Sequence, residues 1–209
     1  MQTEQIFRRV AELRRELADV AETLTDEQLA TPSLCGTWDV RTVIAHLTVL
    51  PTISKPRFGL AALRHRGDID RTIDAISRQQ ARLPISRVAG LLRDNAESRA
   101  TPPLMPAQAP LADLIAHTAD YRIPLGLPFT PVAGDAELTL GFLSRSPLGF
   151  QPRRRLDGIR LVAVDLGQSW GEGAEVTGTA ADLITSVLGR PVALDRLDGP
   201  GRDLLLSRI

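Results

Sequence analysis

The sequence has little of what several common kinds of site depend on. Cys35 is the only cysteine among the 209 residues, so the chain can form no internal disulfide and no zinc site of the four-cysteine type. The formal net charge is zero, which argues against a surface for nucleic acid or for an acidic membrane. Hydrophobic residues make up 43% and charged residues 24%, proportions that are ordinary for a soluble globular protein.

Long apolar runs are also missing. No segment approaches the roughly 18 consecutive apolar residues of a membrane-spanning helix. The first twenty residues, MQTEQIFRRVAELRRELADV, are amphipathic and charged, and they lack the apolar core of a signal peptide. We therefore expect a soluble cytoplasmic protein with no membrane partner and no nucleic-acid partner.

Apolar periodicity predicts a helical N-terminal part. Residues 4–24 place apolar side chains three and four positions apart, which is the pattern of one helix face. Prolines mark where the later helices break or begin. The other helices expected in this part span about 39–50, ending before Pro51, about 68–100, with a break at Pro84, and 110–126, after the proline-rich linker 101–110.

The pattern changes after residue 127. β-type runs are expected over 136–144 and 158–167, and a strand or turn then leads into a helix that ends at Gly189. The last eight residues predict a short terminal helix. The expected fold class is therefore α+β, with a helical domain over 1–126 and a smaller α+β domain over 135–209.

Polar residues gather on two of the expected helices. At 100° per residue, His46 falls at the edge of the apolar arc of its helix. Asp113, His117 and Asp120 share a narrow stripe on the later helix, with Tyr121 close by, and residues four apart are neighbours on a helix surface. A carboxylate and an imidazole one turn apart, completed by a histidine from a facing helix, can bind zinc or another divalent ion such as Ni²⁺.

Other interpretations of the same residues stay open. Asp113 and His117 can form a simple intrahelical ion pair, and His46 can be a satisfied histidine at the boundary of the core. His65 stands in the basic segment LRHRGD and is interpreted as a surface residue. For a lone cysteine in a turn, such as Cys35, a small apolar filler is the default interpretation, although a reactive thiol is possible.

Three segments of the chain resemble a known family. TPSLCGTWDVRTVIAHLTVL resembles the N-terminal signature of the mycothiol-dependent maleylpyruvate isomerase family, within the DinB-like superfamily. DLIAHTADYRIPLG is similar to the second signature of that family, and GTAADLITSVLGRPVALDRLDGPG to its C-terminal segment. The segments occur in the family order, and the resemblance covers most of the chain apart from about 51–105.

The resemblance implies a DinB-like four-helix bundle with a divalent-metal site, followed by a small α+β domain. Carried over by position, the ligands are His46, Asp113 and His117, with zinc as the metal expected first. The characterised family member is a zinc enzyme that uses mycothiol, a low-molecular-weight thiol, to isomerise maleylpyruvate to fumarylpyruvate. Asp113 departs from the family pattern, which has glutamate there, so its carboxylate reaches less far from the backbone.

The resemblance thus implies a mycothiol-using transferase or isomerase in which a metal ion lowers the pKa of a thiol that attacks a small electrophile. Asp120 is expected to orient a ligand histidine, or to pair with Arg122. Arg122 is a candidate for holding an anionic substrate; the alternative is a surface or interdomain ion pair. Trp38 and Tyr121 are candidates for lining the active-site cleft; the alternative is that they pack in the core. The alternatives are a non-catalytic metal-binding or sensory protein and a structural module with a vestigial triad.

Overall fold

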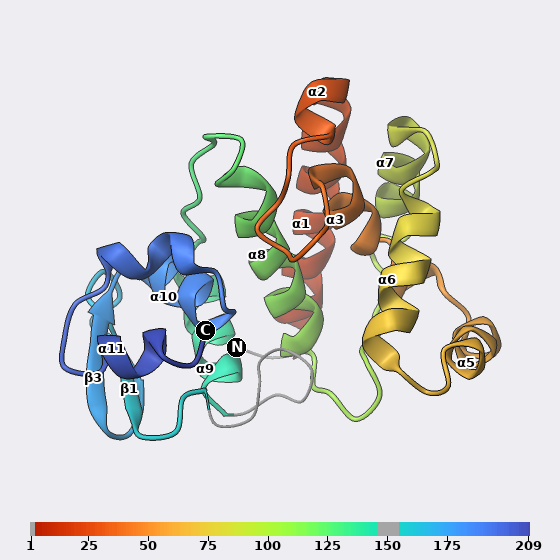
Figure 1. Ribbon diagram of the computed structural model, residues 1–209. Coiled ribbons are helices and arrows are strands. Elements are labelled where there is room, and N and C mark those ends of the chain that lie inside the picture. Colours follow the sequence, from red (N-terminus) through yellow and green to blue (C-terminus); the bar gives the residue numbers. More distant parts are fainter. Residues whose placement is uncertain (1–2, 146–154) are drawn as a thin grey trace. The chain divides into compact units, whose positions relative to one another are not determined.

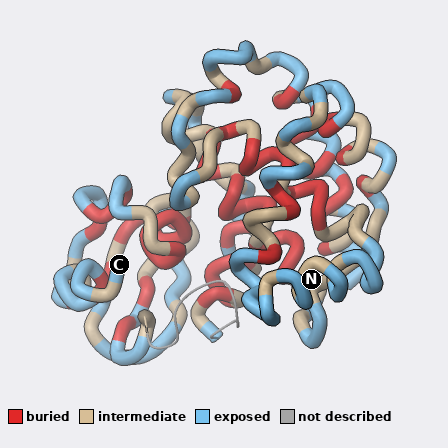
Figure 2. The backbone as a smooth tube through the Cα atoms, turned by 45° about the vertical axis from the view of Figure 1, so that its right-hand side comes forward, coloured by how far each residue is buried: buried red, intermediate tan, exposed pale blue. Residues whose placement is uncertain are grey.

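The computed structural model describes residues 3–145 and 155–209, and the chain divides into two compact units (Figure 1). Met1–Leu127 is helical, whereas Pro128–Ile209 combines a small sheet with helices, which confirms the α+β fold class. Each unit has buried segments of its own (Figure 2). Among the residues described, no helix is both long and apolar enough to cross a lipid bilayer.

The helical unit packs its long helices in pairs. α1 contacts α7 and α8, while α3 contacts α6 and α8. The contact between α3 and α8 joins the two helices that carry the histidines of the predicted metal site. The helices of this unit are α1 (Thr3–Thr23), α2 (Asp26–Leu29), α3 (Val40–His46), α4 (Val49–Thr52), α5 (Lys55–Arg64), α6 (Ile69–Gln80), α7 (Ile85–Asp94) and α8 (Gln108–Arg122).

The ends of these helices differ in places from expectation. α3 stops at His46, and the separate short helix α4 contains Pro51, because a proline in the first turn of a helix sacrifices no hydrogen bond. For the same reason α8 begins two residues before Pro110. The break at Pro84 is confirmed, since that residue precedes the first residue of α7.

The core face of α1 includes an arginine. Arg14 is 2% exposed, and its Nη1 donates to the carbonyls of Ala96 (2.9 Å) and Ser98 (2.7 Å), with the carbonyl of Asn95 at 3.3 Å. These carbonyls belong to the segment just after α7, so Arg14 ties that segment to α1. Burial lowers the pKa of Arg14 to about 10, against the opposing effect of nearby carboxylates, so the side chain is charged at neutral pH.

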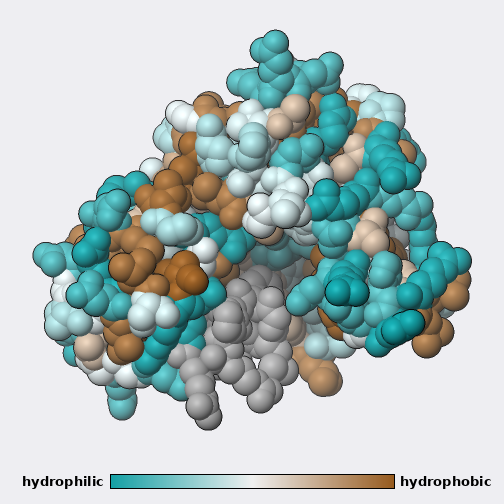
Figure 3. Space-filling view, in the orientation of Figure 1, coloured by the Kyte–Doolittle hydropathy of each residue, from teal (hydrophilic) through white to brown (hydrophobic). Residues whose placement is uncertain are grey.

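Hydrophilic side chains cover much of the visible face of the helical unit (Figure 3). α5 contributes no buried residue, and its Leu60 and Leu63 are exposed. Single exposed leucines are normal on soluble proteins. Buried polar residues, by contrast, include Thr72 and Ser77 on α6 and His117 and Asp120 on α8.

The second unit is built around a three-stranded mixed sheet of order β2-β1-β3. Leu161 of β1 pairs with Trp170 of β2 in antiparallel register and with Val176 of β3 in parallel register. α10 packs on β1 and β3 and covers buried residues of both strands. The elements are α9 (Ala133–Leu143), β1 (Ile159–Ala163), β2 (Gln168–Gly171), β3 (Ala174–Gly178), α10 (Ala180–Val187), the 3₁₀ helix η1 (Pro191–Arg196) and α11 (Arg202–Leu206).

The β-type run expected over 136–144 is wrong, because this segment forms most of α9. Its alternating leucines suggest a strand, but Ala136, Leu140 and Leu143 are buried at helical spacing, and α9 packs against α10. At Gly141 a Cβ would lie 3.4 Å from the indole Nε1 of Trp170, an ordinary van der Waals contact, so α9 lies close to β2. Tertiary packing therefore overrides the local β pattern.

Candidate metal centre

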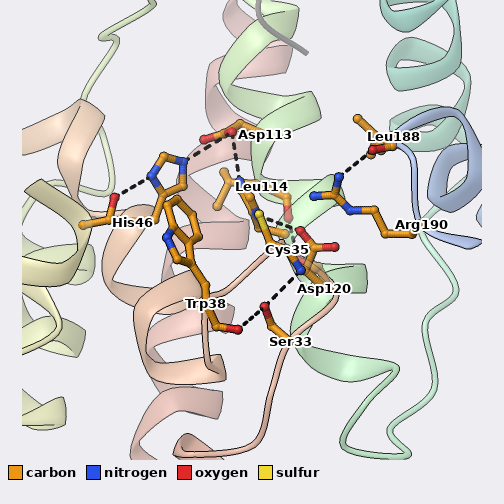
Figure 4. A network of polar contacts seen from close by, with 12 residues as sticks. Ser33, Cys35, Trp38, His46, Asp113, Leu114, Asp120, Leu188 and Arg190 are labelled. Atoms are coloured by element: carbon orange, nitrogen blue, oxygen red, sulfur yellow. Dashed lines mark hydrogen bonds and ion pairs between the residues drawn. The ribbon is translucent and has the colours of Figure 1, made fainter. Parts of the chain in front are cut away.

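The loop between α2 and α3 holds Trp38 beside the candidate site. The backbone N–H and the hydroxyl of Ser33 both donate to the Trp38 carbonyl, at 2.9 and 2.8 Å. The indole Nε1 donates to Asp74 Oδ1 on α6 at 2.6 Å, and the same oxygen accepts from Arg78. The indole is thereby fixed between the loop and α6, with its ring centroid 5.0 Å from that of His46 (Figure 4).

His46, Asp113 and His117 face one another across the contact between α3 and α8. Asp113 and His117 lie one turn apart on α8, so their side chains share one helix face. Asp113 Oδ1 lies 3.5 Å from His117 Nε2 and 3.7 Å from His46 Nε2 (Figure 4). One possible ligand atom from each residue lies within 4.8 Å of the other two. The three side chains are only 10 to 24% exposed, so their interactions are partly shielded from water.

The Nδ1 atom of each imidazole forms a hydrogen bond on the side of the ring away from Asp113. The Ser77 hydroxyl donates to the Ile73 carbonyl at 2.7 Å, so its oxygen is left to accept from His46 Nδ1, 3.0 Å away. Asp120, which is fully buried, accepts from His117 Nδ1 at 2.9 Å. With a proton held on Nδ1 by these partners, each ring would have its Nε2 lone pair available for a metal ion beside Asp113.

The surroundings of Asp113 favour its ionised form. Burial acts to raise its pKa, but the interactions with His46, and then the charges of His117 and Arg14, outweigh burial and lower the pKa. Asp113 is therefore a carboxylate at neutral pH and a suitable anionic ligand.

The lowered pKa of Asp113 predicts a loss of stability in acid. Ionised Asp113 stabilises the folded state above the ordinary carboxyl pKa of about 3.9, and this contribution disappears as the pH falls through the lower folded-state value. In an Asp113→Asn variant the contribution is absent. We expect the free energies of unfolding of the metal-free wild type and variant to approach each other as the pH falls below about 4, and to meet below the lowered folded-state pKa. Urea unfolding across a pH series measures this difference, and a difference independent of pH would contradict the assignment.

The donor set fits a divalent ion. Two ligands at about 2.0–2.2 Å from one zinc, at a tetrahedral angle, lie about 3.3–3.6 Å apart. The two nitrogen–oxygen separations, 3.5 and 3.7 Å, are close to this range. Asp113 therefore reaches both imidazoles although it is one methylene shorter than glutamate. Two nitrogens and one oxygen leave a fourth position open, as in catalytic zinc sites.

Comparison with known families decides where this arrangement belongs. The family model described as the mycothiol maleylpyruvate isomerase N-terminal domain matches residues 10–125, more than half of the chain. The chain belongs to this family. The matched range contains His46, Asp113 and His117, so the three converging side chains all lie within the mycothiol maleylpyruvate isomerase N-terminal domain.

Two crystal structures share the fold of this family member. A structure of the mycothiol-dependent maleylpyruvate isomerase is 15% identical, with a TM-score of 0.54, and the match covers 96% of this chain and 93% of that one. A histidine-to-alanine mutant of the mycothiol-dependent maleylpyruvate isomerase is 13% identical, with a TM-score of 0.56 and the same coverage. The resemblance inferred from the sequence is thus confirmed at the level of family and fold. No curated protein sequence matches the chain.

The four remaining residues predicted to belong to the site, Asp120, Trp38, Tyr121 and Arg122, lie in different surroundings. Asp120 contacts His117 directly, and Trp38 is half-buried with its ring centroid 6.1 Å from that of His117. Tyr121 is 2% exposed and belongs to the core, where burial raises its pKa while Arg122 opposes the rise. Arg122 Nη1 lies 3.5 Å from the Tyr121 hydroxyl. Of these four residues, Asp120 and Trp38 are the two beside the imidazoles.

Three residues beside this candidate centre, Asp74, Ser77 and Cys35, were not predicted from the sequence to lie there. Ser77 and Asp74 come from α6, a segment without a recognisable motif, and only the packing of α3 on α6 reveals their roles. Cys35, interpreted as an apolar filler, lies with its sulfur within 4.8 Å of ligand atoms of His117 and Asp120. The one sequence signal that Cys35 lies near the candidate site is its short spacing from Trp38 within the first of the three segments that resemble the family.

Proposed function

We propose that this protein is a metal-dependent transferase or isomerase that uses mycothiol to modify a small electrophilic substrate. The observation that carries the proposal is the convergence of Asp113 Oδ1 with the Nε2 atoms of His46 and His117. In this proposal the three residues hold a divalent ion, with zinc as the first candidate. Such an ion, when bound, supplies Lewis acidity that lowers the pKa of a coordinated thiol.

The protein's own residues prepare the site. Ser77 and Asp120 hold the Nδ1 protons, so that neither imidazole must change tautomer when it acts as a ligand. Asp113 contributes one negative charge, which partly neutralises a divalent cation. Trp38, fixed by Asp74, presents an aromatic surface beside both imidazoles against which a thiol or its substrate can pack.

Thiol consumption tests the proposed function. Zinc-loaded protein is incubated with mycothiol and a panel of electrophiles that includes maleylpyruvate, and thiol loss and isomerised product are both measured. Metal-free protein and the Asp113→Asn variant are the controls. Turnover that requires both zinc and Asp113 supports the proposal. Stoichiometric zinc without turnover of any panel member supports a non-catalytic metal-binding protein instead, and absence of zinc binding overturns both.

Ser77 is expected to affect zinc affinity although it is not a ligand. In Ser77→Ala the acceptor for His46 Nδ1–H is lost, so the ring is free to rotate or to change tautomer. Loss of such an outer partner typically costs about 10–100-fold in metal affinity. Competition with a chromophoric chelator measures this change.

Thr72→Val is the matched control for Ser77→Ala. Thr72 is also fully buried on α6 and also donates to the carbonyl four residues earlier, at 2.6 Å. Its hydroxyl bonds to the Asp68 carbonyl and, within the described part of the chain, to neither imidazole, so its loss should leave zinc affinity unchanged. Equal loss of affinity in both variants would mean that α6 acts through general stability rather than through His46.

A further inference from the structure

Cys35 lies at the rear edge of the metal centre rather than among its three converging ligands. Its sulfur, one ring nitrogen of His117 and one carboxylate oxygen of Asp120 all lie within 4.8 Å of one another. The loop that carries Cys35 is tied to α8, because the N–H of Leu34 donates to the backbone carbonyl of Asp120 at 3.1 Å. The N–H of Cys35 donates to the hydroxyl of Ser33 at 3.0 Å and fixes the turn (Figure 4).

These three residues offer a donor set different from that of the first group. A thiolate, an imidazole and a carboxylate suit thiophilic divalent ions, which prefer sulfur ligands. His117 Nδ1 faces Asp120 at 2.9 Å, whereas Nε2 faces Asp113 at 3.5 Å. The second group can therefore take Nδ1, the nitrogen opposite to the one that faces Asp113.

We propose that Cys35, His117 and Asp120 form a second metal position, for a thiophilic divalent ion such as Cd²⁺, that excludes metal from the first. A neutral imidazole has a lone pair on only one of its nitrogens, so His117 can serve one position at a time. On binding, the Cys35 thiol releases its proton to solvent, and the imidazole proton moves from Nδ1 to Nε2. Ligands around one ion lie about 3.3–3.8 Å apart, so the loop must close on His117 by up to about 1.5 Å.

Cadmium titration tests this position directly. Because Cys35 is the only cysteine, any cadmium–thiolate charge-transfer absorption must come from its sulfur. We expect this absorption to appear in metal-free wild type, to saturate at one Cd²⁺ per chain, and to have a molar intensity per chain that is the same at every protein concentration. Cys35→Ser should abolish the absorption, whereas His46→Ala should retain it, because His46 belongs only to the first group.

Several outcomes would overturn the second position. No thiolate absorption in wild type would mean that Cys35 does not bind. Loss of the absorption in His46→Ala would mean that Cys35 joins an ion held by the first group. Two Cd²⁺ per chain would disprove mutual exclusion. A molar absorption per chain that rises with protein concentration would indicate an ion bridging two chains. Circular dichroism of each metal-free variant verifies folding, and zinc affinity of Cys35→Ser tests the proposed function separately.

Discussion

Replacing His117 with alanine should abolish stoichiometric zinc binding. His117 supplies Nε2 to the converging group, and its removal leaves one imidazole and one carboxylate, too few donors for tight binding. The loss of affinity should exceed the roughly 10–100-fold expected when only an outer partner is removed. Equilibrium dialysis against a chelator, followed by metal analysis, measures it. Because His117 also belongs to the second position, the same variant should lose the cadmium–thiolate absorption.

His65→Ala is the control for this variant. His65 follows the last residue of α5 and belongs to neither group of converging ligand atoms. Its replacement should leave zinc stoichiometry and affinity as in wild type. Wild-type zinc affinity in His117→Ala would rule out His46, Asp113 and His117 as the metal site, and weakened binding in both variants would indicate that any lost histidine has the same effect.

The convergence of His46, Asp113 and His117 could be anticipated because it depends on local geometry. The spacing of Asp113 and His117 places them on one face of a helix, and the helical phase of His46 places it near the core. The pairing of α3 with α8 is a tertiary fact that periodicity alone does not specify. The family resemblance supplied that pairing, and the distances of 3.5 and 3.7 Å then show that an aspartate reaches both imidazoles.

The residues behind the site could not be anticipated for the same reason. Ser77 and Asp74 act through contacts with α3 and its loop, more than thirty residues earlier in the chain. A serine or an aspartate on an amphipathic helix has no spacing that distinguishes such a role from simple solvation. Arg14 is also hidden, because the apolar spacing over residues 4–24 includes Leu13, whereas its charged neighbour Arg14 is the more buried of the two. The carbonyls that Arg14 satisfies belong to residues about eighty positions away.

Replacing Arg14 should destabilise the helical unit more than replacing any exposed arginine. Arg14→Ala removes the buried donor of the Ala96 and Ser98 carbonyls and leaves a cavity beneath α7. Unsatisfied buried acceptors and a cavity together predict a loss of about 3 kcal/mol or more in the free energy of unfolding. Arg14→Met, which fills much of the space but cannot donate, should lose less than Arg14→Ala and more than a surface variant. Urea unfolding of the metal-free proteins measures all three.

Arg15→Ala supplies the matched surface variant, one position along the same helix. The Arg15 side chain is 49% exposed and pairs with the exposed carboxylate of Glu97. Such pairs contribute about 0–1 kcal/mol, so Arg15→Ala should change the free energy of unfolding by no more than that. If Arg14→Met matched wild type, the hydrogen bonds would contribute little, and packing alone would explain the burial of Arg14. If Arg14→Ala matched Arg15→Ala, the contacts of Arg14 would not stabilise the junction of α1 and α7.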